Sequence, residues 1–412
     1  MVKNNRVDGM DQGADNHMGA ARISKPVEIS FWRHSDIKDD PVLLGLIDKF
    51  NRTHRDIKVE YREVPWDQEH DLLLAAAAEG RPPDCSDVVE YWIGEWVKKD
   101  LLEPLDDYID QWDGSDDLID GYWDWVRAGP DQPRYIVGGG MGCDVIYYRA
   151  DLFEAANLEP PNTYEDLLVA AKKLTRPPRC YGLGMRGSRI GHRFWGDFMR
   201  SQGLNFGGSS GNFTLNIADA VAANQWYIDL YATHRVTPPS AITDSFPQHL
   251  QQLISGEAAI IMHTTHLASL LDEALGQRVA ACRMPAGPNG RHITFYPQNH
   301  AIYRESRNKE AAWVFISWLA EAEQVEAWCR NPQRPLLPNV KSLLGDSVYS
   351  NDRFYKVSLD SMKDWGSDPW FHPQFGPFVE RVWPQTFQRA LRGDISSQEM
   401  MDIFQDHFTG SH

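Results

Sequence analysis

The sequence predicts a layered α/β protein whose first lobe has a mainly parallel sheet. From residue 27 onward, segments with the two-residue alternation of strands take turns with segments that have a helical period of apolar residues. Hydrophobic residues make up 42% of the chain, enough for a large core, which excludes a protein that is disordered throughout. At about 150 residues per domain, the length of 412 residues predicts two or three domains.

The first unit alternates strands and helices in a regular order. Pro41 fits the first turn of a helix that Asp39 or Asp40 can cap, and Gly80 ends the next helix. The β-α-β-α-β order predicts one lobe in which helices cover a parallel sheet. The expected strands are 27–32, 57–64 and 87–91, and the expected helices are 41–54, 67–79 and 92–101.

A second unit follows a glycine cluster at residues 138–142. Thr163 can cap the helix after it, with Asp166 at the capping-box position. After Pro332 the chain is expected to be largely helical. One strand, 134–137, is expected directly before the cluster. After the cluster the expected strands are 144–148, 181–185 and 258–263, and the expected helices are 150–156, 164–174, 192–202, 219–233, 247–255 and 309–328.

Residues 1–26 are polar and rich in Gly, Asp and Asn. We expect them to be a disordered leader, a cloning remnant or a misassigned start, with no visible export signal and no lipid-attachment cysteine. The longest apolar run, residues 72–78, is far shorter than the roughly 18 residues of a membrane span, so no transmembrane segment is expected.

Charge and cysteine content exclude several classes of protein. The formal net charge is −17 and no basic patch is evident, which argues against a nucleic-acid partner and against binding to anionic membranes. The five cysteines are odd in number and none forms a C-x-x-C pair, which argues against a disulfide framework and a zinc ribbon. They are most simply small buried hydrophobic residues.

Motifs for cofactors, metals and catalysis are weak. Residues 182–187 match G-x-G-x-x-G, but the acidic residue of a dinucleotide site is absent about 20 positions on. His263 and His266 are three apart with no third ligand at a recognised metal spacing. We therefore expect no cofactor, no metal and no catalytic residue. Glu90 and Asp144, at predicted strand ends, are the nearest candidate pair for a glycoside-acting enzyme.

Tryptophan is unusually abundant, with 15 residues. Several stand at predicted strand ends or in loops, where aromatic faces can pack against the C–H faces of sugar rings while polar neighbours bind the hydroxyls. This placement favours a carbohydrate cleft, although a simple core position is the alternative for each of them. The residues concerned are Trp32, Trp66, Trp92, Trp195, Trp365 and Trp370.

Residues 144–175, DVIYYRADLFEAANLEPPNTYEDLLVAAKKLT, closely resemble a segment of the extracellular solute-binding proteins of family 1. These are the maltose-binding-protein-like receptors of ABC importers. The resemblance runs from about residue 27 to the end of the chain, and it is specific as a set. Four further segments agree in the same order: 41–67, 87–109, 245–271 and 306–324.

This resemblance implies the type II periplasmic-binding-protein fold, with two α/β lobes, a hinge of several crossings and a central ligand cleft. It implies a non-catalytic periplasmic or extracellular monomer that closes around a carbohydrate (a mono- or oligosaccharide, a glycoside or a polyol) and delivers it to permease subunits. The expected lobes are 27–142 with 299–332, and 145–296 with 336–412; the expected crossings lie near 142–145, 294–300 and 330–336.

The resemblance also implies which residues contact the ligand. Thr264, Thr265 and His266 stand where the family usually has tryptophan, which weakens the case for a stacking surface there. Arg186 and Arg334 leave an acidic ligand open, such as a sugar acid, a phosphodiester or a sulfonate. A sensor that feeds a signalling protein is a further alternative. The implied contacts are Trp32, His34, Ser35, Glu90, Tyr91, Trp92, Gly140, Asp144, Arg186, Trp195, Thr264, Tyr296, Gln298, Asn299 and Arg334.

Overall fold

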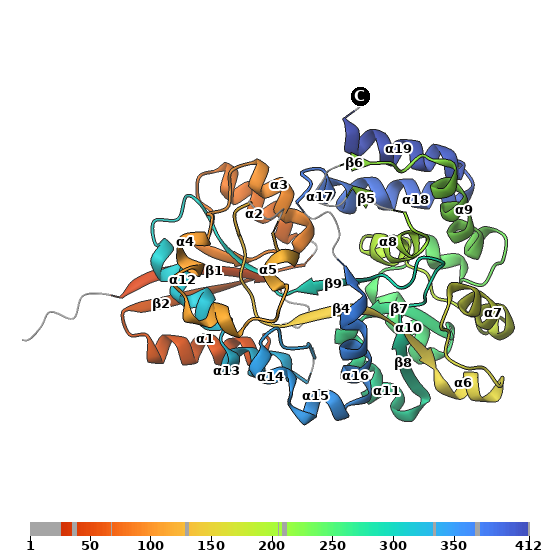
Figure 1. Cartoon of the computed structure of the whole chain (residues 1–412), viewed down its shortest axis with the longest axis horizontal. Helices are drawn as coiled ribbons and strands as arrows, with labels where there is room; N and C mark the ends of the chain where they lie inside the picture. Colours follow the sequence, from red (N-terminus) through yellow and green to blue (C-terminus); the bar gives the residue numbers. More distant parts are fainter. Residues whose placement is uncertain are drawn as a thin grey trace, which may run out of the picture.

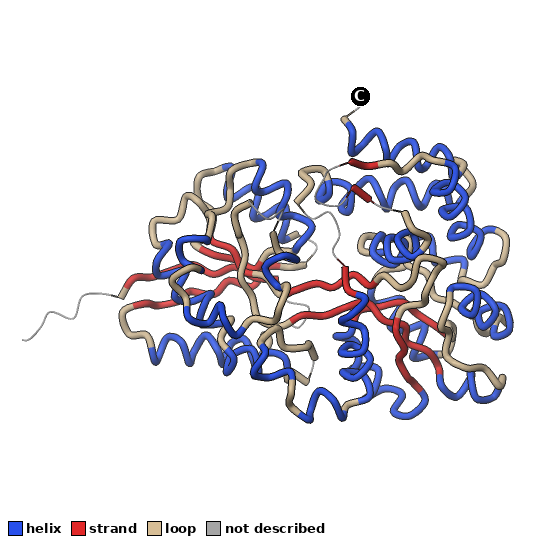
Figure 2. The backbone as a smooth tube through the Cα atoms, in the orientation of Figure 1, coloured by secondary structure: helices blue, strands red, loops and turns tan. Residues whose placement is uncertain are grey.

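The molecule consists of two α/β lobes, and the strands β4 and β9 run between them (Figure 1). In both lobes the strands lie in the middle and helices surround them (Figure 2). Most of the expected leader at residues 1–26 lies outside the described residues. This computed structural model describes residues 26–34, 39–66, 68–127, 132–204, 206–207, 212–332, 335–366 and 371–410.

The first lobe is built on a sheet of strand order β10-β3-β1-β2. Its strands are β1 (Val27–His34), β2 (Ile57–Val64), β3 (Cys85–Asp87) and β10 (His300–Ile302). β1 pairs in parallel with β2 and β3, and β10 returns antiparallel to β3. The expected parallel sheet is therefore confirmed, with one antiparallel edge strand added from much later in the chain.

Helices of the first lobe follow the sequence pattern closely at its start. In α1 the carboxylate of Asp40 caps the helix by accepting a hydrogen bond from the Val42 N–H at 2.9 Å, and apolar residues such as Leu43 and Phe50 are buried. The helices of this part are α1 (Pro41–Thr53), α2 (Glu69–Ala78), α3 (Ile93–Lys98), α4 (Asp106–Ile109), α5 (Tyr122–Trp125), α12 (Lys309–Leu319) and α13 (Ala322–Cys329). The short helix α14 (Lys341–Leu344) follows the last crossing and packs against α13.

The second lobe is built on a sheet of strand order β11-β9-β4-β7, with β8 also paired to β4. The central strand β4 (Met141–Arg149) runs antiparallel to β7 (Ile260–Thr264), β8 (Val279–Arg283) and β9 (Ile293–Pro297), while β11 (Trp365–Gly366) is parallel to β9. Two short strands, β5 (Phe206–Gly207) and β6 (Asn212–Phe213), form a separate pair.

Helices cover this second sheet. The expected capping box is confirmed at the start of α7, where Thr163 and Asp166 exchange hydrogen bonds between side chain and backbone. The helices are α6 (Ala150–Ala155), α7 (Tyr164–Leu174), α8 (Gly191–Ser201), α9 (Ala218–Ala232), α10 (Phe246–Ser255), α11 (Ala268–Leu275), α15 (Ser347–Asn351), α16 (Arg353–Ser361), α17 (Phe375–Pro377), α18 (Trp383–Arg392) and α19 (Ser397–Thr409).

Four expected elements differ from the structure. The strand expected at 87–91 ends at Asp87, because the chain turns into a 3-10 helix at Glu90–Trp92. The segments 134–137 and 181–185 make only isolated bridges; in the latter, the backbone at Gly182 lies so close to Ala171 that no side chain fits there. The helix expected at 309–328 is broken between α12 and α13, where the bend packs against Gly139.

The connection between the lobes depends on close backbone packing in the glycine cluster. Met141–Cys143 of β4 pair with Phe295–Pro297 of β9, and the next residues of β4 pair with β7. A Cβ at Gly138 would lie 1.5 Å from the carbonyl oxygen of Gln298, so only glycine allows the two crossings to approach this closely. The boundaries 27–142 with 299–332, and 145–296 with 336–412, stay a prediction.

None of the described helices combines the length and the hydrophobicity needed to cross a membrane. Each of the five cysteines is a free thiol. Cys85, Cys143 and Cys329 are buried, as expected, while Cys180 and Cys282 are only half-buried.

Candidate functional site

A cavity of about 470 Å³ lies between the two lobes, where the carboxyl ends of β1 and β3 face the second lobe. Its volume falls in the range of small-molecule sites, and the edge at which parallel strands end is a common place for a ligand. The lining residues are His34, Trp66, Asp87, Val88, Val89, Glu90, Tyr91, Arg186, Ser188, Arg189, Ile190, Arg193, Ser245, Phe246, Pro247, His263, Thr264, His266, Tyr296, Pro297, Gln298 and Asn299.

On the first lobe, His34 lies between two buried carboxylates. The ring Nδ1 is 2.8 Å from Glu69 Oε2 and 2.9 Å from Asp87 Oδ2, and the His34 backbone N–H donates to Glu69 Oε1 at 3.1 Å. β1 and β3 are neighbours in the sheet, which brings His34 and Asp87 together at their ends, and Glu69 reaches them from the first turn of α2. Trp66 covers the cluster, with its ring centroid 4.4 Å from that of His34.

These three side chains are close enough to be considered as metal ligands, because their donor atoms lie within 4.8 Å of one another. Burial lowers the pKa of His34, but Asp87 and Glu69 outweigh this and raise it to about 9. Burial and then Asp87 raise the pKa of Glu69 to about 8. The cluster therefore holds protons as an ion-paired group, and a metal ion would bind there only by displacing them.

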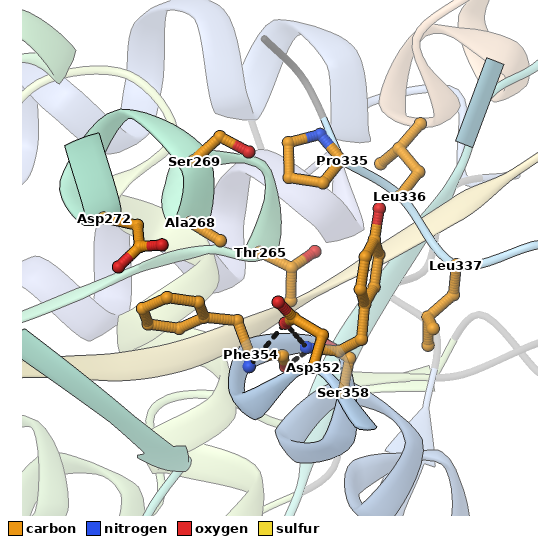
Figure 3. A pocket seen from close by; sticks show the side chains of 11 residues that line it. Thr265, Ala268, Ser269, Asp272, Pro335, Leu336, Leu337, Asp352, Phe354 and Ser358 are labelled. Carbon is orange, nitrogen blue, oxygen red and sulfur yellow. Dashed lines mark hydrogen bonds between the residues drawn. The ribbon is translucent and has the colours of Figure 1, made fainter. Parts of the chain in front are cut away.

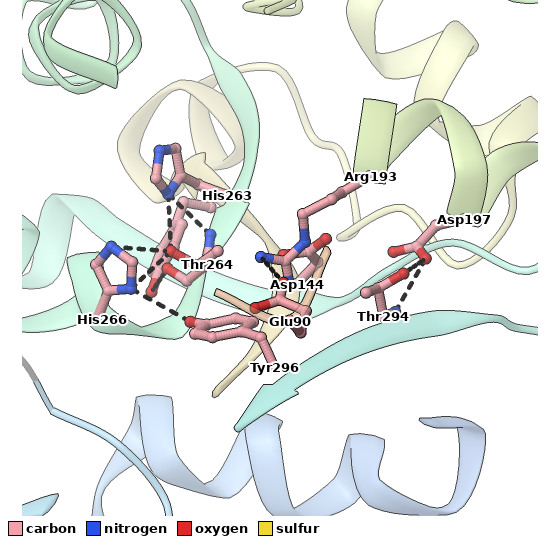
Figure 4. A network of polar contacts seen from close by, with 10 residues as sticks. Glu90, Asp144, Arg193, Asp197, His263, Thr264, His266, Thr294 and Tyr296 are labelled. Carbon is pink, nitrogen blue, oxygen red and sulfur yellow. Dashed lines mark hydrogen bonds and ion pairs between the residues drawn. The ribbon is translucent and has the colours of Figure 1, made fainter. Parts of the chain in front are cut away.

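On the second lobe, Arg193 lies at the centre of a polar network (Figure 4). Its Nη2 is 3.3 Å from Asp144 Oδ1, its Nη1 is 4.0 Å from Glu90 Oε1, and its guanidinium carbon lies 4.3 Å from the ring centroid of Tyr296. Asp144 comes from β4 and Glu90 from the first lobe, so Arg193 links the two lobes. Glu90 and Asp144 therefore share one cation and form an ion-pair network. In a glycosidase, by contrast, the two carboxylates act as acid and nucleophile on opposite sides of the substrate.

The position of Arg193 is fixed by the helix that carries it. Asp197, one turn further along α8, accepts hydrogen bonds from the N–H and the hydroxyl of Thr294 at 2.9 and 2.6 Å, which ties α8 to β9. Ile190 lies directly before α8 with φ of 74°, a strained conformation for a β-branched residue, and it lines the cavity.

A chain of hydrogen bonds runs along the end of β7 to Tyr296 (Figure 4). The Thr264 N–H donates to His263 Nδ1 at 2.8 Å, the Thr264 hydroxyl contacts His266 Nδ1 at 2.9 Å, and the same His266 atom is 3.2 Å from the Tyr296 hydroxyl. Burial and then Arg186 hold the pKa of His263 well below its usual value. The ring is therefore neutral, and because Nδ1 accepts, Nε2 carries the proton.

Asn299 supplies an unsatisfied amide to the same cavity. The residue is 2% exposed and lines the cavity, yet neither its Oδ1 nor its Nδ2 has a hydrogen-bond partner within the described part of the chain. A buried amide without partners is costly unless a ligand supplies them, and an amide can both donate to and accept from a hydroxyl.

The structure brings together eight residues that the resemblance implied as ligand contacts. They come from both lobes and from the crossings, and all of them line the cavity: His34, Glu90, Tyr91, Arg186, Thr264, Tyr296, Gln298 and Asn299. Asp144 is fully buried and does not line the cavity itself, but it contacts Arg193, which does. Ser35 and Arg334 lie outside the described residues.

Four implied contacts lie elsewhere, and each has a structural reason. Trp32 lies two residues before the end of β1, where Arg62 covers its ring with a guanidinium–centroid distance of 4.0 Å. Trp92 is buried and stacks on Trp96, and Trp195 is buried and donates its Nε1 hydrogen to Asn224 at 2.9 Å. Gly140 donates its N–H to Asn339 in the crossing.

Among the tryptophans expected at a sugar cleft, Trp66 is the one that lines the cavity within the described residues. The sequence interpretation missed Asp87, Arg189 and Arg193 as wall residues. A signal was present for the arginines: Arg186, Arg189 and Arg193 fall within eight residues of an otherwise acidic chain.

A second, smaller cavity of about 60 Å³ lies beside α16, next to the segment Pro335, Leu336 and Leu337 (Figure 3). Phe354 and the N-cap residue Asp352 form part of its wall, and the Asp352 carboxylate accepts hydrogen bonds from the first turn of α16. The space suits a few water molecules rather than a sugar. The larger cavity is therefore the candidate ligand site.

Comparison with known sequences agrees with this geometry. A sequence model of the family described as bacterial extracellular solute-binding protein matches residues 34–326. A Brucella abortus protein named only as a binding protein is 26% identical over 291 residues, which are 66% of this chain and 67% of that protein. The mannitol-binding protein of Pseudomonas aeruginosa is 26% identical over 392 residues, 85% of this chain and 86% of that protein.

Comparison with solved structures supports the fold. An ABC transporter solute-binding protein from Thermotoga lettingae, bound with α-D-tagatose, superposes with a TM-score of 0.83 at 21% identity. The match covers 93% of this chain and 99% of that one. The expected two-lobed type II architecture with a central ligand cleft is thereby confirmed.

Proposed function

The chain belongs to the bacterial extracellular solute-binding protein family, and from that premise we propose that it is the non-catalytic receptor of an ABC importer for a carbohydrate or polyol. The ligand binds in the cavity between the lobes, and the closed protein delivers it to the permease. The observation that carries this proposal is the buried Asn299 amide, which lines the cavity without a partner among the described residues.

The polar groups of the wall suit a molecule with many hydroxyls. Asp87 and Glu90 are acceptors, Arg186 is a donor, and the amides of Gln298 and Asn299 are both. Trp66 and Tyr91 supply aromatic surface beside them. Mannitol and tagatose, the ligands printed in the names of two proteins similar to this one, are polyhydroxylated molecules of this kind.

We expect the two lobes to close around the ligand, because residues of both lobes line the same cavity. Glu90 of the first lobe lies 4.0 Å from Arg193 of the second, and both residues line the cavity. A ligand that touches both lobes prefers the closed arrangement and shifts the population toward it. The permease then has a signal that ligand is present, because it meets a different surface in the open and closed proteins.

A binding role accounts for Glu90 and Asp144 better than hydrolysis does. Their shared neighbour Arg193 offsets the charge of both carboxylates, and Asp144 is fully buried behind the wall. We assign the protein to the periplasm or the cell exterior, as the family description implies, and we propose that it acts as a monomer without a nucleic-acid partner.

The proposal is tested by thermal unfolding of the full chain in the presence of neutral sugars, polyols and oligosaccharides, followed by calorimetry. A ligand that binds only the folded protein raises the melting temperature. We expect one ligand per chain and unchanged ligand in chromatography after overnight incubation. A product would show an enzyme instead of a receptor, and no binding across the panel would overturn the carbohydrate assignment.

A further inference from the structure

Arg186 stands out among the charged residues of the cavity wall. The residue is 9% exposed and lines the cavity. Its Nε donates to the Ser188 hydroxyl at 3.3 Å. Within the part of the chain that the structure describes, its guanidinium forms no ion pair and its two terminal nitrogens make no hydrogen bond, so these donors are available to a molecule in the cavity.

The other cations of this wall each have a carboxylate nearby. Arg189 Nη1 is 3.0 Å from Glu380 Oε2, Arg193 Nη2 is 3.3 Å from Asp144 Oδ1, and His34 Nδ1 is 2.9 Å from Asp87 Oδ2. Arg186 is therefore the cation of the described wall that has no carboxylate in direct contact, although the charge of Asp144 acts on it from further away.

The surroundings of Arg186 make this charge costly. Burial, and then the neighbouring Arg189, lowers the pKa of Arg186 to about 10, which still leaves the guanidinium charged at neutral pH. The nearby rings of His249 and His263 are neutral, because burial and Arg186 lower the pKa of both. A buried charge without a partner is strongly destabilising, and an anion in the cavity would relieve it.

The backbone around Arg186 is tightly held, so the guanidinium is presented from a rigid loop. A Cβ at Gly187 would lie 2.2 Å from the carbonyl oxygen of Ile242, and a Cβ at Gly191 would lie 2.0 Å from that of Arg186 itself. Both contacts allow glycine only. The loop is thus packed against α8 on one side and against the segment before α10 on the other.

We propose that the ligand is a sugar acid or other acidic polyol whose single carboxylate binds Arg186, while its hydroxyls bind Asn299 and the residues that the first lobe contributes to the wall. This inference rests on the proposed receptor function and narrows its substrate class. A planar guanidinium matches a carboxylate with two parallel hydrogen bonds. Asp87 and Glu90, which the first lobe contributes to the wall, favour hydroxyls beside them and disfavour a second negative charge.

The carboxylate has a second donor within reach of the same wall. His263 lines the cavity, and its protonated Nε2 is buried without a hydrogen-bond partner among the described residues. Because this N–H belongs to a neutral ring, it can donate to an anion without adding charge. The guanidinium of Arg186 and the Nε2–H of His263, both from the second lobe, can therefore donate hydrogen bonds to the carboxylate of the ligand.

The test compares matched pairs of ligands that differ in one acidic group: D-gluconate with D-glucitol, D-glucuronate with D-glucose, and D-galacturonate with D-galactose. Calorimetry with the full chain is expected to show at least one acid bound about tenfold more tightly than its neutral partner. In Arg186→Gln this preference is lost, whereas Arg186→Lys keeps part of it as a point charge. Arg179→Gln, at an exposed site of the same lobe, keeps the preference.

Three other outcomes would overturn the inference, and they distinguish a wrong ligand class from a wrong receptor function. If neutral members bind and acids do not, the acidic ligand is wrong while the receptor function stands. If an acid binds and Arg186→Gln retains the full preference with an unchanged melting temperature, the anion lies elsewhere. If no member of any pair and no neutral oligosaccharide binds, both the inference and the proposed function are wrong.

Discussion

The carboxylate of Glu380 accepts a hydrogen bond from the indole Nε1 of Trp92 at 3.1 Å. Glu380 belongs to the C-terminal helical region, and Trp92 belongs to the core of the first lobe. The same carboxylate pairs with Arg189 at 3.0 Å, and Arg189 lies over the ring of Trp66 with a guanidinium–centroid distance of 4.8 Å. Beside the cavity, one acidic residue therefore connects the two lobes.

Replacing Glu380 by glutamine is expected to weaken ligand binding by about threefold to tenfold, or up to about 1.4 kcal/mol. The amide oxygen can still accept from Trp92, but the ion pair with Arg189 is lost, and this pair is partly buried, so solvent screens it less than a surface pair. Calorimetry measures the affinity. Because a contact between the lobes is lost, small-angle scattering of the unliganded variant is expected to show a larger radius of gyration.

Asp394→Asn is the matched control for this change. Asp394 pairs with Arg392 at 3.2 Å, but both side chains are largely exposed and lie within one lobe. The affinity and the radius of gyration should stay as in the unmodified protein. Equal behaviour of the two variants would show that Glu380 does not hold the lobes together.

Asn299→Leu is expected to lower the affinity by tenfold or more without lowering the melting temperature. The amide has no partner among the described residues, so an apolar side chain of similar size removes a desolvation cost in the empty protein and removes hydrogen bonds in the complex. Calorimetry and thermal unfolding measure the two effects separately.

Asn339→Leu provides the contrast. Asn339 is equally buried, but its Oδ1 accepts from the Gly140 N–H at 2.9 Å and its Nδ2 donates to the Gly138 carbonyl. This change should lower stability by about 1–3 kcal/mol, because two backbone groups lose their partners. A loss of stability in Asn299→Leu as large as in Asn339→Leu would contradict a ligand-binding role for Asn299.

Local sequence patterns were sufficient for much of the first lobe. The alternation in β1 and β2 and the apolar period of α1 are properties of neighbouring residues, and these elements lie where they were expected. The pairing of His300 with Asp87 could not be read in the same way, because it joins segments far apart in the chain. The end of β3 at Asp87 was missed since the apolar run continues into the buried 3-10 turn.

The candidate site was harder to predict, and α8 shows why. Nearly every residue of this helix is buried, so its apolar pattern does not distinguish the side that faces the core from the side that faces the cavity. Trp195 was expected at the ligand and lies against Asn224, whereas Arg193 was not expected and lines the wall. The cluster of His34, Glu69 and Asp87 likewise depends on which strands are neighbours.

Stability is expected to fall as the pH rises toward 9, because the folded protein holds protons at His34 and Glu69 that the unfolded chain releases at lower pH. Asp87 and Glu69 raise the pKa of His34 to about 9 despite burial, and burial with Asp87 raises that of Glu69 to about 8. For His34 this contribution is present below pH 6.5 and is lost by about pH 9, whereas for Glu69 it starts to fall above pH 4.5 and is lost by about pH 8. The loss should be about 1–3 kcal/mol.

Urea unfolding at pH 6, 7, 8 and 9 measures this dependence. Glu69→Gln should flatten the slope, because the amide does not titrate, and His34→Gln should flatten it as well. His234→Gln, at a residue that follows α9 and does not line the cavity, should keep the slope of the unmodified protein. The same slope in all four proteins would mean that the cluster does not hold the protons.

Gly191→Ala is expected to lower both stability and affinity. The added Cβ would lie 2.0 Å from the carbonyl oxygen of Arg186 and 2.8 Å from the ring of Trp383, so the loop that carries Arg186 must shift. Strain of this kind costs about 1–3 kcal/mol, and a displaced guanidinium no longer meets its ligand with the same geometry.

Gly45→Ala in α1 is the control, since no atom lies within 4 Å of its Cβ position. That change should raise stability by about 0.5–1 kcal/mol through helix propensity and leave binding unchanged. Full affinity in Gly191→Ala, measured by calorimetry on the folded variant, would show that the position of the Arg186 loop does not govern recognition.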